Sequence, residues 1–160
     1  MDSSSHNALV DSFVLDMPSA GARHLTIGWL LLSYGARVIG GLFTILIVRS
    51  RTPYFQEIIP WVDFFHTAIV VHVDLTVLVW FLGFAGVLWS LNQKSTCLQC
   101  AWLALGLAVL GTLVITAAPF LGADKPLMNN YVPVLQHPIF LFGLGLIGLG
   151  FTLQVLNGLL

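Results

Sequence analysis

Charged residues are scarce in this sequence. Six Lys and Arg and seven Asp and Glu make up 8% of its 160 residues, whereas a soluble domain carries about a quarter. This scarcity excludes a soluble monomer, and the 58% hydrophobic content excludes a disordered chain, which needs low hydrophobicity. The formal net charge of −1 provides neither the basic footprint of a nucleic-acid-binding protein nor an acidic tail.

Cysteine is also scarce, since only Cys97 and Cys100 occur, and two cysteines cannot build a secreted disulfide scaffold. Their CxxC spacing is found in redox dithiols and in half of a zinc site. The sequence has no second pair and no βαβ pattern around the first, so we interpret the spacing as chance. The sequence has no phosphate-binding glycine loop with a lysine. It also has no arrangement of residues typical of a serine or cysteine nucleophile.

Long apolar runs are what the sequence has in abundance. A helix crosses the hydrocarbon core of a bilayer in about 20 apolar residues, and four continuous runs qualify, at about 25–48, 64–91, 98–121 and 132–156. Continuous runs without strict alternation indicate helices rather than barrel strands. We therefore predict an all-α polytopic membrane protein, with an extramembrane tail at 1–24 and a four-helix transmembrane domain at 25–160. An even number of spans places both termini on one side, but the few Lys and Arg do not decide which side.

Three ionisable residues fall inside the predicted spans, namely Arg37, His72 and Asp74. Each is costly at that depth and needs a partner or a function. Arg37 and Asp74 lie at similar depth on antiparallel helices joined by a short loop. We expect a buried Arg37–Asp74 ion pair that fixes the packing of spans one and two, with a proton-pathway role as the alternative.

His72 begins a stripe along one face of the second span. The stripe is made mostly of small or weakly polar residues and contains His72, Thr76, Val79, Gly83, Gly86 and Ser90. A haem fits such a strip, because imidazole is a common axial ligand and small residues let the ring plane approach the backbone. The alternative is a helix–helix seam, and span three offers such a seam with Ala101, Ala104, Ala108 and Gly111.

Further histidines and arginines collect at one end of the predicted bundle. They are His66, His137, Arg49 and Arg51, with Tyr54 and Trp61 on the same side. Arg49 and Arg51 could neutralise haem propionates, or His66, His72 and His137 could bind copper or zinc. The alternative is an interfacial belt that faces lipid headgroups.

Residues 64–81, from Phe64-Phe65-His66 through His72-Val73-Asp74 to Trp80-Phe81, resemble the second transmembrane helix of subunit I in the haem–copper oxidase and nitric oxide reductase superfamily. Residues 34–49 resemble the first helix of that family, and residues 129–138 with the following Gly-rich span are similar to its loop and fourth helix. The resemblance implies that His72 is an axial ligand of a low-spin haem, with Arg49 near that haem. The family's remaining ligands lie on later helices, beyond these four.

The resemblance therefore implies a membrane subunit of a respiratory oxidase or nitric oxide reductase complex, the N-terminal part of a split subunit I or a small relative of it. The subunit would not be catalytic alone. It would share a haem of b or a type with a partner chain that brings the remaining helices, and would receive electrons from cytochrome c or quinol. We expect it in the bacterial or mitochondrial inner membrane. The alternatives are a haem-free structural subunit and a small copper-binding membrane protein.

Overall fold

The computed structural model describes residues 17–54, 64–92, 97–123, 125–128 and 132–159. The expected N-terminal tail up to residue 16, and Trp61 of the expected interfacial belt, lie outside these ranges. The elements, in chain order, are α2 (Ala20–Ser50), α4 (Phe64–Val73), the π-helical segment η1 (Asp74–Val79), α5 (Trp80–Asn92), α6 (Leu98–Ala117), the 3-10 helix η2 (Ala118–Leu121), β1 (Pro126–Leu127), β2 (Val134–Leu135) and α7 (Pro138–Leu159).

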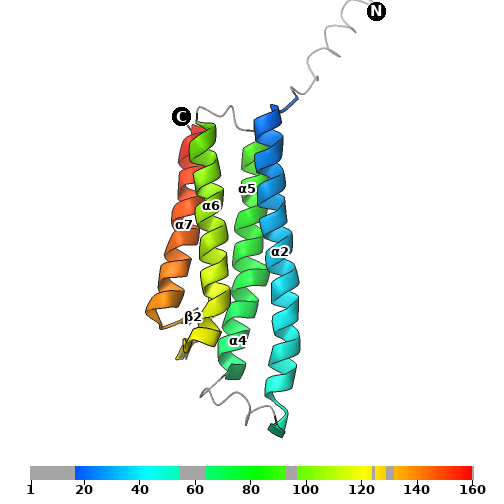
Figure 1. Ribbon diagram of the computed structural model, residues 1–160, viewed down its shortest axis with the longest axis vertical. Helices are drawn as coiled ribbons and strands as arrows, with labels where there is room; N and C mark the ends of the chain where they lie inside the picture. The colour runs from blue at the N-terminus through cyan, green and yellow to red at the C-terminus, as the bar shows by residue number, and fades with distance from the viewer. Residues whose placement is uncertain (1–16, 55–63, 93–96, 124, 129–131, 160) are drawn as a thin grey trace, which may run out of the picture.

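Four helical rods make up this all-α integral membrane protein, as the sequence predicts. The described part of the chain holds helices of 31, 29, 24 and 22 residues that are long and apolar enough to cross a membrane. The second rod runs without a break through α4, η1 and α5, and the third through α6 and η2. The start of α2 and the end of α7 lie at the same end of the bundle (Figure 1), as an even number of spans requires.

Two helix starts differ from the sequence prediction. Helix α2 begins at Ala20 rather than at residue 25, because the Ser19 hydroxyl accepts a hydrogen bond from the Ala22 N–H at 3.2 Å and caps the helix there. Helix α7 begins at Pro138 rather than at residue 132. The preceding residues instead form an antiparallel pair of two-residue strands, in which Leu127 lies opposite Val134.

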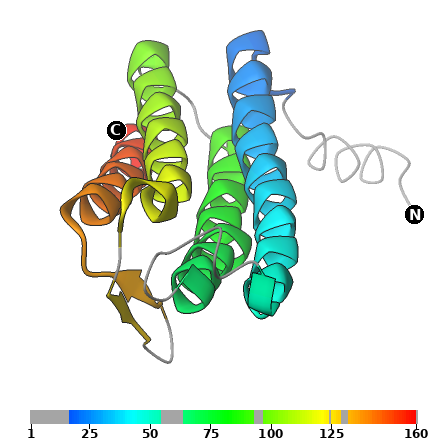
Figure 2. The same ribbon diagram turned by 60° about the horizontal axis from the view of Figure 1, so that its bottom comes forward.

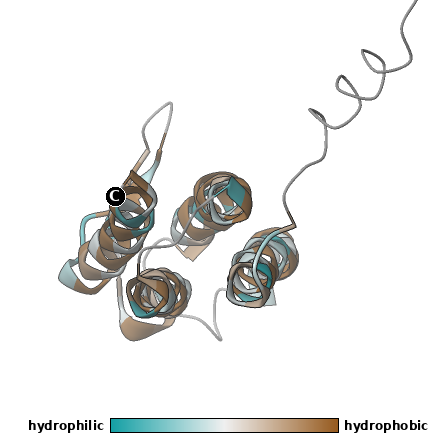
Figure 3. Cartoon of the chain, turned by 90° about the horizontal axis from the view of Figure 1, so that it is seen from above, coloured by the Kyte–Doolittle hydropathy of each residue, from teal (hydrophilic) through white to brown (hydrophobic). Residues whose placement is uncertain are grey.

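The bundle is built from two helix pairs, which are seen obliquely in Figure 2, while Figure 3 views the four rods from above. Helix α2 packs along α4, η1 and α5, while α6 packs along α7. Small residues bring α6 and α7 together: a Cβ added at Gly111 would collide with the Gly143 carbonyl, and one added at Gly150 would collide with the Ala104 carbonyl. The small residues of span three therefore form a helix–helix seam with α7.

Polar contacts hold the helices together at the end where α2 begins, and one of them joins the two pairs. The Gln154 amide donates to the Ser90 hydroxyl at 3.0 Å, and both side chains are buried. The Asn157 amide donates to the Cys97 carbonyl at 3.1 Å. These bonds tie α7 to α5 and to the start of α6. Towards the opposite end, a core cluster that includes Phe43, Leu75 and Phe140 fills the space between the rods.

Candidate functional site

A π-helical turn interrupts the second rod beside the residues that the sequence singles out. The Trp80 N–H bonds to the Leu75 carbonyl, five residues back, instead of four. π-Helical turns are rare in proteins as a whole, and many of those that occur lie at functional sites. His72 lies two residues before the π-helical turn of this rod, and Asp74 is the first residue of that turn.

His72 is held by the backbone of α2. Its Nδ1 lies 2.8 Å from the Gly40 carbonyl oxygen and 3.3 Å from the Thr44 hydroxyl. A carbonyl oxygen only accepts, so Nδ1 donates its proton to Gly40, which assigns the neutral ring its lone pair on Nε2. Metal-binding histidines usually donate the other ring N–H in this way, which fixes the ring and its tautomer. The His72 side chain is half-buried.

The small-residue stripe along the second rod is a packing seam with α2. A Cβ added at Gly40 would meet the Thr76 methyl group, and one added at Gly83 would collide with the Ser33 hydroxyl. The prediction that Thr76 and Gly83 form a wall for a haem is therefore wrong. Small residues let α2 approach closely and occupy the space that the prediction gave to the ring plane. An axial imidazole fits the described residues, but a haem wall along this stripe does not.

The predicted Arg37–Asp74 ion pair is not formed. The Arg37 guanidinium donates to the Thr76 carbonyl at 3.2 Å and lies 4.5 Å from the centre of the Trp80 ring. Both Asp74 carboxyl oxygens are buried and have no hydrogen-bond partner. Arg37 and Asp74 lie at similar depth, but they lie on different sides of the second rod. Similar depth alone does not bring two side chains into contact.

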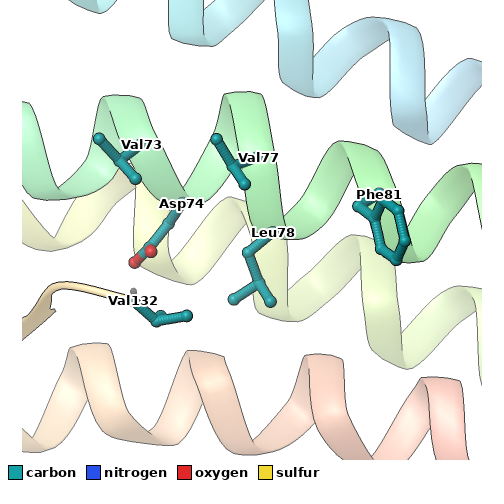
Figure 4. Close-up of a pocket in the computed structure, with 6 residues that line it drawn as sticks. All are labelled: Val73, Asp74, Val77, Leu78, Phe81 and Val132. Carbon is teal, nitrogen blue, oxygen red and sulfur yellow. The ribbon is translucent and has the colours of Figure 1, made fainter. Parts of the chain in front are cut away.

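Asp74 points into a cavity of about 120 Å³ (Figure 4). Its carboxyl group is directed towards Val132, from the segment before α7. The other lining residues are also apolar, and they are Val73, Val77, Leu78 and Phe81. The Asp74 carboxyl is therefore the one polar side-chain group among these lining residues.

The histidines do not assemble into a metal site. Within the described ranges, no three His, Cys, Asp or Glu residues lie close enough to hold a metal ion, so the predicted copper or zinc site of His66, His72 and His137 is wrong. His137 Nδ1 accepts the Ile139 N–H at 3.3 Å, at the first turn of α7. His66 is exposed and packs edge-on against Phe65, with ring centres 5.1 Å apart.

Arg49 and Arg51, the arginines predicted to pair with haem propionates, are both exposed at the end of the bundle where α2 ends. Arg49 lies in the last turn of α2. The Arg51 guanidinium lies 4.2 Å from the centre of the Phe65 ring, which is a cation–π contact. Their predicted role towards a cofactor stays a prediction.

Cys97 and Cys100 form a disulfide at the start of α6. The Cys97 sulfur also accepts the Cys100 N–H at 3.2 Å and caps the helix. Both sulfurs are engaged with each other, so the pair does not serve as half of a zinc site in this state.

Sequence reasoning missed the residues that position the site. The Gly40 carbonyl and the Thr44 hydroxyl hold His72, and the Trp80 ring holds Arg37. Every residue has a backbone carbonyl, so the residue type does not show which carbonyl will accept a hydrogen bond. The Gly40-Gly41 pair was the available signal, because glycine on a membrane helix marks a close approach of a neighbour.

The chain is similar to two proteins of unstated function. An uncharacterized protein of Aquifex aeolicus (strain VF5) is 34% identical over 129 residues, which cover 81% of this chain and 32% of that protein. Uncharacterized protein RP382 of Rickettsia prowazekii (strain Madrid E) is 27% identical over an alignment 154 positions long, and the match covers 81% of this chain and 30% of that protein. The chain thus spans about a third of the length of these curated relatives. No protein-family model and no solved structure matches it.

Proposed function

We propose that this chain is a membrane subunit of a haem–copper-type respiratory oxidase or nitric oxide reductase complex in the bacterial inner membrane. In this proposal, His72 supplies one axial ligand to a low-spin haem that is shared with a partner chain. The observation that carries it is the hydrogen bond from His72 Nδ1 to the Gly40 carbonyl at 2.8 Å. That bond leaves Nε2 as the ligating atom, as in other metal-bound histidines.

The chain's own residues orient the imidazole and set its basicity. The Gly40 carbonyl accepts the Nδ1 proton and makes Nε2 more electron-rich, and the Thr44 hydroxyl restricts ring rotation from one turn further along α2. The haem supplies the one-electron redox chemistry when it is bound. Because α2 covers Thr76 and Gly83, this chain contributes a ligand rather than a wall, and the partner chain provides the surface against which the ring lies.

Two further features agree with this proposal. Arg49 and Arg51 lie exposed beyond His72, at the end of α2, where they could pair with propionates. The relatives are about three times as long as the matched segment. In them, the remaining sequence leaves room for the part that would bring the second axial ligand.

The test is the absorption spectrum of the complex purified through this chain, compared between wild type, His72→Ala and His66→Ala. We expect the low-spin haem band in reduced-minus-oxidised spectra to be lost in His72→Ala and retained in His66→Ala, which changes an exposed histidine about 1.7 helical turns away. A low-spin band that persists unchanged in His72→Ala would refute the proposal.

A haem-free structural subunit is the second candidate, and the packing of the stripe against α2 favours it. In that case, the Gly40 carbonyl and His72 would only pin α2 to α4. A wild-type complex that is purified with all its chains and has no haem absorption would select this candidate.

A further inference from the structure

The Asp74 carboxyl is the least explained group in the described part of the protein. The residue is 0% exposed, and neither oxygen has a hydrogen-bond partner. Arg37, the basic residue at similar depth, is engaged with the Thr76 carbonyl and the Trp80 ring. An unpaired acid inside a membrane protein is costly, and such residues normally face a partner or a pathway.

The cavity beside Asp74 restricts what can meet the carboxyl. Hard metal ions such as Ca²⁺ and Mg²⁺ take about six oxygen ligands, whereas the side chains beside Asp74 that line this cavity in the described part of the chain are apolar. Its volume of about 120 Å³ is close to that of an engineered cavity that binds benzene, at roughly 150 Å³. The space therefore suits one side chain with an apolar stem and a single polar head.

The cavity also borders the outer surface of the bundle. Val77 and Phe81 line it and are 56% and 66% exposed, so a helix lying on this surface would pass directly over the carboxyl. Lysine and arginine bury their methylene stems against apolar walls and place the charged head at a polar group. Charge complementarity then selects a basic head for the unpaired carboxyl.

We propose that the surface around Val77 and Phe81 is the docking site for a transmembrane helix of a partner chain, and that a lysine or arginine in the middle of that helix enters the cavity and pairs with Asp74. The inference uses the partner chain of the proposed function, but it does not depend on a haem. The spectrum of His72→Ala and the test below can therefore fail separately.

The experiment isolates the complex from native membranes in mild detergent through a tag on this chain, and measures how much of each partner chain accompanies it. We expect Asp74→Asn to lower the amount of one membrane chain at least about tenfold, because breaking a buried charge pair leaves the other charge unpaired. Val77→Trp fills the cavity mouth without altering the carboxyl and should cause the same loss. The matched control Leu110→Trp changes a residue of α6 that is 50% exposed and lies outside the cavity, and should retain the chain.

The identity of the basic residue is decided by exchanging the charges. The chain that is lost should carry a lysine or arginine in the middle of a span. Replacing that residue by glutamine should reproduce the loss, while replacing it by aspartate together with Asp74→Lys should restore co-purification. The inference is overturned if Asp74→Asn retains every partner chain, as expected for a carboxyl that meets only protons or a lipid hydroxyl. It is equally overturned if the chain lost has no such basic residue, or if the exchanged pair restores nothing.

Discussion

Replacing Gly111 by alanine should destabilise the α6–α7 pair. A Cβ at this position would lie 2.8 Å from both the amide nitrogen and a side-chain carbon of Ile147, and it would also press on the Gly143 carbonyl. Ordinary contacts begin near 3.4 Å. Two of the three obstructing atoms belong to the backbone, so no change of rotamer removes the collision, and the two helices have to move apart.

Gly106 provides a matched control on the same helix, because a Cβ added there meets nothing within 4 Å. At an open helical position, Gly→Ala gains about 1 kcal/mol from helix propensity. At Gly111 the same gain is offset by overpacking, which typically costs about 1–3 kcal/mol. Gly106→Ala should therefore raise the free energy of unfolding by about 1 kcal/mol. The two variants should differ by roughly 1–3 kcal/mol, or about 5- to 150-fold in the unfolding equilibrium constant.

The assay is reversible unfolding in mixed micelles of dodecyl maltoside and SDS, followed by far-ultraviolet circular dichroism. Gly145→Ala on α7 also adds a methyl group in open space and should behave like Gly106→Ala. If Gly111→Ala is as stable as the two control variants, then α6 and α7 do not touch at this glycine, and the assignment of the small residues of α6 to α7 is refuted.

Three further predictions concern polar contacts. Arg37→Gln should lower the free energy of unfolding by about 1 kcal/mol, because it removes the hydrogen bond to the Thr76 carbonyl and the cation–π contact with Trp80. Arg37→Lys should recover part of this loss. Identical unfolding midpoints for the wild type and both variants would contradict this role of Arg37. Gln154→Leu removes the buried bond to Ser90 and should cost about 0.6 kcal/mol, a typical value for bonds between membrane helices; a gain in stability in the same micelles would argue against that contact. The Cys97–Cys100 disulfide predicts that the chain, unfolded under non-reducing conditions, takes up thiol-alkylating reagent only after reduction, which mass spectrometry measures directly; two alkylated thiols without reductant would show that the bond is absent.

The four rods could be predicted from sequence because the thickness of a bilayer sets the length of an apolar run. Their boundaries were less predictable. Ser19 caps α2 and starts it at Ala20. Hydropathy assigns the first residues of this helix to the predicted N-terminal tail, because the segment contains polar residues. Strands of two residues, such as Val134–Leu135, are too short to show an alternating pattern, and their residues were absorbed into the apolar run that follows.

The sequence singles out His72 and Asp74, but it pairs Asp74 with the wrong residue, and the role of His72 stays a prediction. Position along a span gives depth, and depth alone placed Arg37 beside Asp74. Rotation about the helix axis decides contact as well, and it depends on which neighbour each face meets. The face of the second rod that carries Gly83 was assigned to a cofactor, because small residues suit a flat ring and a close helix equally well.

The π-helical turn from Asp74 to Val79 affects how the second rod aligns with the corresponding helix of a related protein. A ring closed over five residues instead of four contains one residue more than a regular α-helical turn, so the rod is an α-helix with a one-residue insertion absorbed in mid-span. A relative that lacks this residue could cross the membrane with an unbroken α-helix and still present the counterparts of His72 and Gly83 to the same neighbour. Residue-by-residue comparison of this helix should therefore allow a gap of one position at the turn, since otherwise every residue beyond Val79 is displaced by about 100° around the axis.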